Sequence, residues 1–100
     1  MILERFVEGG WWPYGNYDSA NSLAKAAYWL GKNDASTEQI RVPDIVSKNK
    51  LERKVDGEWH YYGVYNTIPH LIRACFELGR MGDCCDDLRV LEVHAKEADD

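Results

Sequence analysis

The sequence predicts an α+β fold: a tandem ββαβ repeat with pseudo-two-fold symmetry, in which two helices pack on one face of an antiparallel sheet. The main observation is a duplication. Residues 51–79 align without a gap with residues 3–31, at an offset of 48, and 13 of the 29 positions are identical. Each copy has an aromatic-rich hairpin pattern followed by apolar residues at helical spacing. One hundred residues suffice for one core, so we expect a single domain over 1–100, with repeat 1 at 2–45 and repeat 2 at 50–94.

Each repeat is expected to open with a β-hairpin. The predicted strands cover residues 2–7 and 11–17 in the first repeat, and residues 50–55 and 59–65 in the second. The dipeptide Asp56-Gly57 is typical of a type I′ turn, because both of its positions need a positive φ. Pro13 has no backbone N–H, which predicts that the first return strand lies at a sheet edge.

A helix is predicted after each hairpin. Residues that can cap free backbone amides mark the two helix starts, Asp18-Ser19 and Asn66-Thr67. The helices share an apolar stripe formed by Leu23, Ala26, Ala27 and Leu30 and by Leu71, Ala74, Cys75 and Leu78. Gly31 and Gly79 follow these stripes, and we interpret them as left-handed C-caps.

A short third strand is expected to close each repeat, at residues 39–42 and 88–93. Between the repeats, residues 43–49 include Pro43 and several polar side chains, which predicts a solvated connector. The unit is therefore strand, turn, strand, helix and strand, made twice.

The aromatic hairpins supply the first candidate site. Side chains alternate between faces along a strand, so Trp11 and Trp59 would share one face, and the other face would carry Trp12, Tyr14, His60 and Tyr62. We expect one of these sets to pack beneath the helices and the other to cover an open face beside Glu4 and Phe6. The set Trp12, Tyr14, His60 and Tyr62 is taken as the one on the open face, where it is a candidate ligand- or partner-binding surface. The alternative is that these residues only pair across strands and cover the sheet.

Trp29 is a second candidate contact. Its repeat-mate is Glu77, and a position that accepts glutamate in one copy is expected to be exposed. Trp29 would then mark an interface, or it would pack against the opposite half. The many aromatic residues and the broadly apolar helices predict a homodimer.

The charge of the chain bounds its partners. A formal net charge of −5 disfavours non-specific binding to nucleic acid or to an anionic membrane. No apolar run approaches the roughly 18 residues of a membrane span, and the N-terminal residues lack a signal-peptide pattern. We expect a cytoplasmic protein with no membrane partner. A basic run could contact phosphates or could be a solvated linker; it comprises Arg41, Lys48, Lys50, Arg53 and Lys54.

Reactive side chains form no recognisable constellation. His60 and His70 could act as acid–base groups, but Trp12 and Ser22 stand at their repeat-mates and no catalytic partner can be assigned. The adjacent Cys84 and Cys85, followed by His94, lack the spacing of zinc ligands. The sequence thus predicts no catalytic residue, no metal site and no cofactor.

The sequence favours a non-enzymatic binding or interaction module that uses an aromatic sheet face and forms a homodimer. One alternative is a small nucleic-acid-binding module that uses the basic run and the aromatic residues. A second alternative is a small enzyme that uses His60 or His70.

Overall fold

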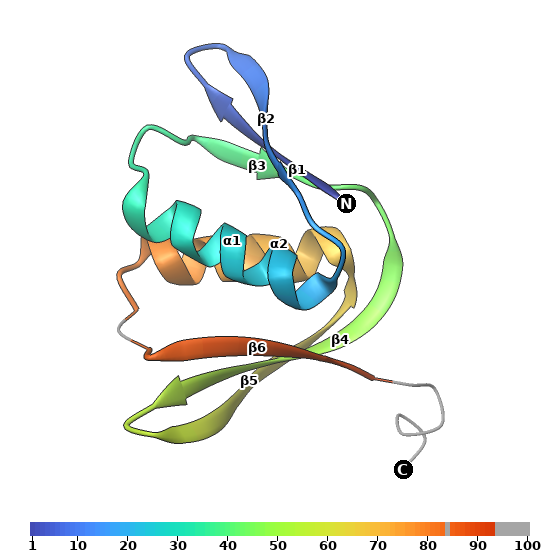
Figure 1. Cartoon of the computed structure of the whole chain (residues 1–100), viewed down its shortest axis with the longest axis vertical. Coiled ribbons are helices and arrows are strands. Elements are labelled where there is room, and N and C mark those ends of the chain that lie inside the picture. The colour runs from blue at the N-terminus through green and yellow to red at the C-terminus, as the bar shows by residue number, and fades with distance from the viewer. Residues whose placement is uncertain (84, 94–100) are drawn as a thin grey trace.

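The computed structural model describes residues 1–83 and 85–93 of the chain (Figure 1). The first half contains β1 (Ile2–Val7), β2 (Gly10–Asn16), α1 (Ala20–Asn33) and β3 (Gln39–Arg41). The second half contains β4 (Val46–Val55), β5 (Glu58–Thr67), α2 (Ile68–Arg80) and β6 (Asp87–Glu92). The predicted α+β class and the ββαβ order of each half are confirmed.

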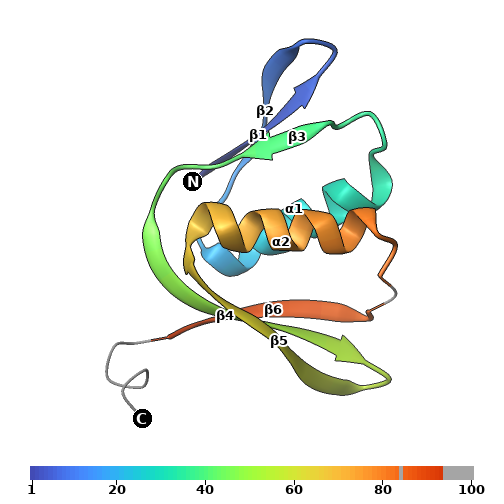
Figure 2. The same cartoon turned by 180° about the vertical axis from the view of Figure 1, so that it is seen from behind.

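The strands form two three-stranded antiparallel sheets, one from each half, in the orders β2-β1-β3 and β5-β4-β6. Helices α1 and α2 lie side by side between the two sheets (Figures 1 and 2). Each half forms an antiparallel sheet, but the described strands of one half do not pair with those of the other. The helices therefore lie between two sheets and not, as expected from the sequence, on one face of a single sheet. The physical reason is that both helices are apolar over a broad arc, and two sheets cover them from two sides. The pseudo-two-fold relation stays a prediction, which superposition of residues 3–31 on residues 51–79 measures.

Both hairpins have the predicted turn. Asp56 and Gly57 adopt positive φ angles of 54° and 82°, and Glu8 and Gly9 adopt 51° and 81° in the first half. Two successive positive φ angles define the type I′ turn, whose twist matches that of the flanking strands. Pro13 lies in β2, which is an edge strand as predicted.

The helices begin where the sequence predicts. Ser19 caps α1 by accepting from the backbone N–H of Ser22, and Thr67 caps α2 by accepting from that of His70. Pro69 lies in the first turn of α2, where its missing N–H costs little. Neither described helix has the length and apolarity to span a membrane.

Gly31 and Gly79 are not C-caps, and this prediction was wrong. Both lie inside their helices, at the crossing of α1 and α2. A Cβ on Gly31 would come within 2.2 Å of the Phe76 carbonyl oxygen, and one on Gly79 within 2.1 Å of that of Tyr28. Only glycine lets the backbones approach this closely. The left-handed residue after α2 is Gly82, with φ of 76°.

One core joins the two halves. It contains Leu3 and Leu51 from the central strands, Leu23 and Leu71 from the helices, and Leu88 from β6, all of them fully or almost fully buried. The predicted connector was too long, because β4 starts at Val46 and Asn49 is buried, with its side-chain amide donating to the carbonyl of Ser47 at 3.1 Å. The N-terminal extension of β4, residues 46–49, could not be predicted from the repeat, because these residues match nothing in the first repeat.

Candidate functional site

The outer face of each sheet, which is the face turned away from the helices, carries a tryptophan covered by an arginine. In the first sheet, Arg41 donates from Nε to Oε1 of Glu4 at 2.7 Å, and its guanidinium carbon lies 4.2 Å from the ring centroid of Trp11. The second sheet repeats both contacts, at 2.7 Å and 4.1 Å, with the repeat-mates Glu52, Arg89 and Trp59. We call these two sets the outer triads. Each triad links all three strands of its sheet.

The glutamate of each triad holds the arginine over the indole. The side chain of Glu52 is only 13% exposed, and the hydrogen bond from Arg89 lowers the pKa of its carboxyl group. The arginine side chains stay more accessible, and that of Arg41 is 52% exposed. Each guanidinium therefore lies over an indole and is still accessible to solvent and to a partner.

The outer face of the second sheet is also more basic than that of the first. Lys50 and Lys54 stand on it where the first sheet has Ile2 and Phe6. Lys54 Nζ lies 5.9 Å from the ring centroid of Trp59. Exposed apolar side chains complete this face, namely Tyr61, Val64 and Leu91. The two outer faces share a triad but differ in charge.

The predicted set Trp12, Tyr14, His60 and Tyr62 does not lie on the outer faces but on the inner faces, which are the faces turned toward the helices. Trp12 and His60 pair across the strands with Arg5 and Arg53, whereas Phe6 pairs with Trp11. The residue that shares a face with Glu4 and Phe6 is therefore Trp11, because directly opposed residues of antiparallel strands point to the same side.

The four candidates are nevertheless exposed, because the hairpin tips point away from the helix layer (Figure 1). An arginine lies near one aromatic ring in each half: the guanidinium of Arg5 is 5.6 Å from the ring centroid of Tyr14, and that of Arg53 is 5.7 Å from that of Tyr62. The structure groups Trp12, Tyr14, His60 and Tyr62 with these arginines, not with the outer triads.

The same arginines tie each sheet to the loop that follows a helix. Arg5 forms an ion pair with Asp34, and Arg53 donates from Nη1 to Oδ1 of Asp83 at 2.6 Å. Hydrogen bonds from Ser36, with smaller effects of Thr37 and Arg5, lower the pKa of Asp34. These ion pairs hold the hairpins in place and neutralise the charges of Arg5 and Arg53.

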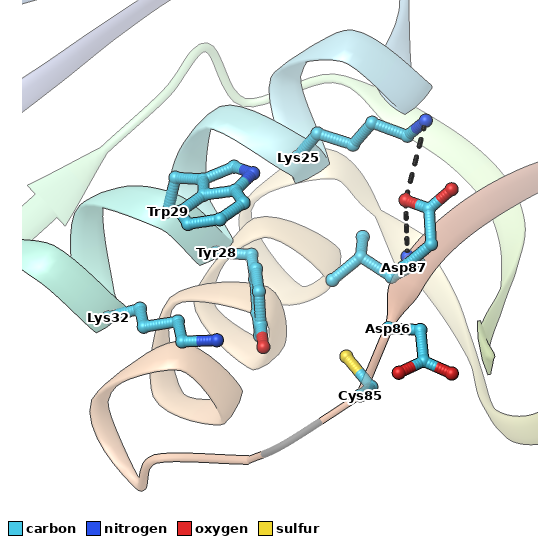
Figure 3. Close-up of a pocket in the computed structure, with 8 residues that line it drawn as sticks. Lys25, Tyr28, Trp29, Lys32, Cys85, Asp86 and Asp87 are labelled. Carbon is cyan, nitrogen blue, oxygen red and sulfur yellow. Dashed lines mark hydrogen bonds and ion pairs between the residues drawn. The ribbon is translucent and has the colours of Figure 1, made fainter. Parts of the chain in front are cut away.

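Trp29 lies at a groove between α1 and the start of β6 (Figure 3). Its side chain is 55% exposed, as the glutamate at its repeat-mate predicts, and it lines the groove together with Cys85, Asp86, Asp87 and Leu88 of the opposite half. Lys32 Nζ lies 5.6 Å and 5.5 Å from the ring centroids of Tyr28 and Trp29, and Lys25 Nζ lies 3.7 Å from Oδ1 of Asp87. The groove encloses about 390 Å³ of empty space.

A second groove lies at the equivalent place between α2 and β3. It is lined by the repeat-mates of seven residues of the first groove: Glu38, Gln39, Ile40, Arg73, Phe76, Glu77 and Arg80. The pair of grooves follows from the way each helix packs beside the third strand of the other half. Because the two grooves occupy equivalent positions, we attribute both to the architecture of the fold. Trp29 distinguishes the first groove from the second, which has Glu77 at the equivalent position.

The other predicted groups are dispersed. Of the basic run, Arg53 is paired on the inner face and Arg41 belongs to the first sheet. Lys50 and Lys54 share the outer face of the second sheet, and Lys48 is exposed near the start of β4. Within residues 1–83 and 85–93, the rings of His60 and His70 make no hydrogen bond or ion pair, and no three metal-binding side chains are grouped. Cys84 and His94 lie outside the described residues, and burial raises the pKa of the Cys85 thiol.

Sequence reasoning misses Arg89 altogether, and it includes Arg41 only as part of the basic run. A signal for them exists, because Arg41-Val42 and Arg89-Val90 match at the same offset of 48 as the rest of the repeat. Finding the triads also needs the register of β3 on β1 and of β6 on β4, which hairpin length does not fix for strands so far apart in the chain.

Comparison with known proteins gives no further guide to the site. The chain matches no protein-family model, no curated protein and no solved structure.

Proposed function

We propose that this chain is a non-enzymatic binding module that engages protein partners through the outer faces of its two sheets. The outer triads carry this proposal. Burial accounts for the identity of Leu3 with Leu51, and the type I′ turn accounts for that of Gly9 with Gly57. Neither explains why both halves have the same glutamate, tryptophan and arginine on their outer faces.

Tryptophan, tyrosine and arginine are the residues that contribute most often to protein–protein binding energy. In each triad, the arginine is already ordered by its glutamate, which lowers the conformational entropy lost on binding. The two outer faces point to opposite sides of the molecule (Figure 1), so one chain could hold two partners or two copies of one partner. We also propose that the chain self-associates, through a surface separate from the outer triads.

The test compares Trp59→Ala with Trp12→Ala, an exposed aromatic outside the triads. Each purified protein is used to capture partners from extracts of cells that express the chain, and each captured candidate is then titrated in pure form. Trp59→Ala is expected to weaken binding by about tenfold or more, since a central aromatic contributes at least about 2 kcal/mol. Trp12→Ala is expected to bind as the unmodified chain does.

The triads could instead serve only to stabilise the sheets through cross-strand contacts. In that case folded Trp59→Ala would lose stability in a thermal melt but would keep the affinity of every captured partner. That result would contradict the proposal.

A second candidate function is binding of single-stranded nucleic acid by the second sheet alone. The observation in its favour is that the outer face carries Lys50, Lys54 and Arg89 together with Trp59 and Tyr61, and that Lys54 and Arg89 lie near the Trp59 ring. Stacking aromatics among cations are typical of such surfaces. The double variant Lys50→Ile with Lys54→Phe places the residues of repeat 1 on this face. It should lower the slope of log affinity against log salt by roughly 0.7 for each phosphate contact removed. Affinity without salt dependence, or no affinity, excludes this candidate.

A further inference from the structure

Four strands lie at sheet edges in the described part of the chain, and three of them are protected against pairing. β2 contains Pro13, and β3 has only 3 residues. β6 carries charged side chains along its length, Asp87, Arg89 and Glu92. Proline, short length and charge are the usual devices that stop an edge strand from pairing with another chain.

β5 has none of these protections. It is 10 residues long and contains no proline, and its only charged residue at neutral pH, apart from the titratable His60, is Glu58 at one end. A long edge strand of this kind presents a row of unpaired backbone groups. β5 is therefore the edge at which this molecule can accept another strand.

The repeat shows which backbone group is free. Pro13 pairs with Glu4 and Tyr61 pairs with Glu52, and both pairs directly follow the same register shift. A proline within a sheet is tolerated where its nitrogen faces away from the neighbouring strand. At the equivalent position of β5, Tyr61 has an N–H, which by this equivalence points away from β4 toward an incoming strand.

An open groove borders this edge, between β5 and α2. Tyr62 and Met81 line it and are exposed, as are Arg73 and Glu77 on the helix side. The groove can accept the side chains that an added strand would turn toward the helix layer.

We propose that β5 pairs in antiparallel orientation with β5 of a second copy, which joins the two sheets into one of six strands. β5 itself has no lysine, arginine or aspartate, and Glu58 lies at its end, so self-pairing opposes no like charges at the centre of the paired strands. In a two-fold arrangement the α2 helices run antiparallel, and the exposed, oppositely charged Arg73 and Glu77, which lie one turn apart on α2, form a self-complementary pair of charges. Such a contact uses the same edge of both copies and closes as a dimer. This inference rests on the proposed function only for self-association.

The test places in β5 the proline that protects the equivalent edge strand of repeat 1, where Pro13 is the repeat-mate of Tyr61. Tyr61→Pro removes the outward N–H from both strands of the dimer, and Tyr61→Thr is the matched control, because threonine keeps the N–H and suits a strand. We expect the unmodified chain and Tyr61→Thr to be dimers by light scattering at micromolar concentration. Tyr61→Pro should remain folded by circular dichroism and raise the dimer dissociation constant by roughly tenfold to a hundredfold, since two hydrogen bonds are lost.

If Tyr61→Pro fails to fold, Tyr61→Lys decides. It places a lysine in each of the two paired strands and keeps the backbone donor, and Tyr61 is 64% exposed, so folding should be unaffected. A folded Tyr61→Lys that is monomeric supports the proposal. The proposal is overturned by a monomeric unmodified chain, by a dimer that survives both variants, or by a dimer that only Trp29→Glu disrupts. Partner capture by the outer triads is a separate measurement and does not depend on these outcomes.

Discussion

Glycine at positions 31 and 79 sets the distance between the two helices. The contacts are reciprocal: Gly31 faces the backbone of Phe76 and Arg80, and Gly79 faces that of their repeat-mates Tyr28 and Lys32. A methyl group at either position would overlap a backbone carbonyl, which cannot rotate away. The helices would then have to separate along the crossing.

Gly79→Ala and Gly31→Ala should each destabilise the fold by about 1–3 kcal/mol or more, as overpacked cores do. For a domain of this size, each kcal/mol lowers the midpoint of thermal unfolding by about 4–8 °C. Because one shift of the helices relieves both overlaps, the double variant should lose less stability than the sum of the single losses. Gly57→Ala, which is strained by its positive φ of 82° at a site with open space in the distant β4–β5 turn, should add to Gly79→Ala. Additive losses at Gly31 and Gly79 would contradict this reading of the crossing.

Glu52 should make stability depend on pH. The hydrogen bond from Arg89, with further effects of Lys50, lowers the folded-state pKa of Glu52 below its unfolded value of about 4.3. A depressed pKa contributes stability that is present above the unfolded pKa and is lost as pH falls through the folded pKa. Glu52→Gln should therefore unfold at lower urea than the unmodified chain at pH 7, and the difference should shrink below pH of about 4. Glu58→Gln, at the exposed first residue of β5, is the control. A difference that does not change with pH would refute the role of the Glu52 charge.

The buried thiols should be unreactive while the chain is folded. Burial raises the pKa of Cys75 to about 12 and also raises that of Cys85, and only the thiolate form is a good nucleophile. In a Cys84→Ser background, a thiol reagent at pH 8 should label neither residue until urea unfolds the chain, after which both should react. Rapid labelling before unfolding would show that one of the two sites is open.

At the scale of elements, the sequence predicts what local chemistry decides. The caps at Ser19 and Thr67 follow from side chains that can accept from first-turn amides. The turn at Asp56-Gly57 follows from residues that tolerate positive φ. The duplication strengthens each of these predictions, because two copies give the same answer.

The missed features depend on contacts between elements. Glycine after an apolar helical stripe has the same local pattern whether it ends a helix or lies at a helix crossing, and only the partner helix distinguishes the two at Gly31 and Gly79. Alternation separates Trp11 from Trp12 but does not say which of them faces the helices. The outer triads depend on the pairing of β3 with β1 and of β6 with β4, and no local signal encodes this pairing.

At the scale of the whole molecule, the halves are interlocked. The backbone N–H of Val90 in β6 donates to Oδ1 of Asn21 in α1 at 2.9 Å, and Arg80 at the end of α2 donates to the carbonyl of Thr37 before β3 at 2.6 Å. The hydroxyl of Tyr28 in α1 donates to the carbonyl of Asp83 at 2.7 Å. Each helix thus completes its packing against a segment of the other half.

This interlocking predicts that neither half folds alone. A fragment of residues 1–45 would leave Leu23 and Leu30 of α1 without α2, and it is shorter than the roughly 50 residues at which single cores become stable. By circular dichroism, fragments 1–45 and 46–100 should each lack a cooperative thermal transition. Mixed at equal concentration, they should recover one, with a midpoint that rises with concentration because the folded state is a complex. Mixing with Gly79→Ala in the second fragment should recover less structure, since the helix crossing lies at the junction. A cooperative transition in either fragment by itself would show that the repeat is two domains rather than one.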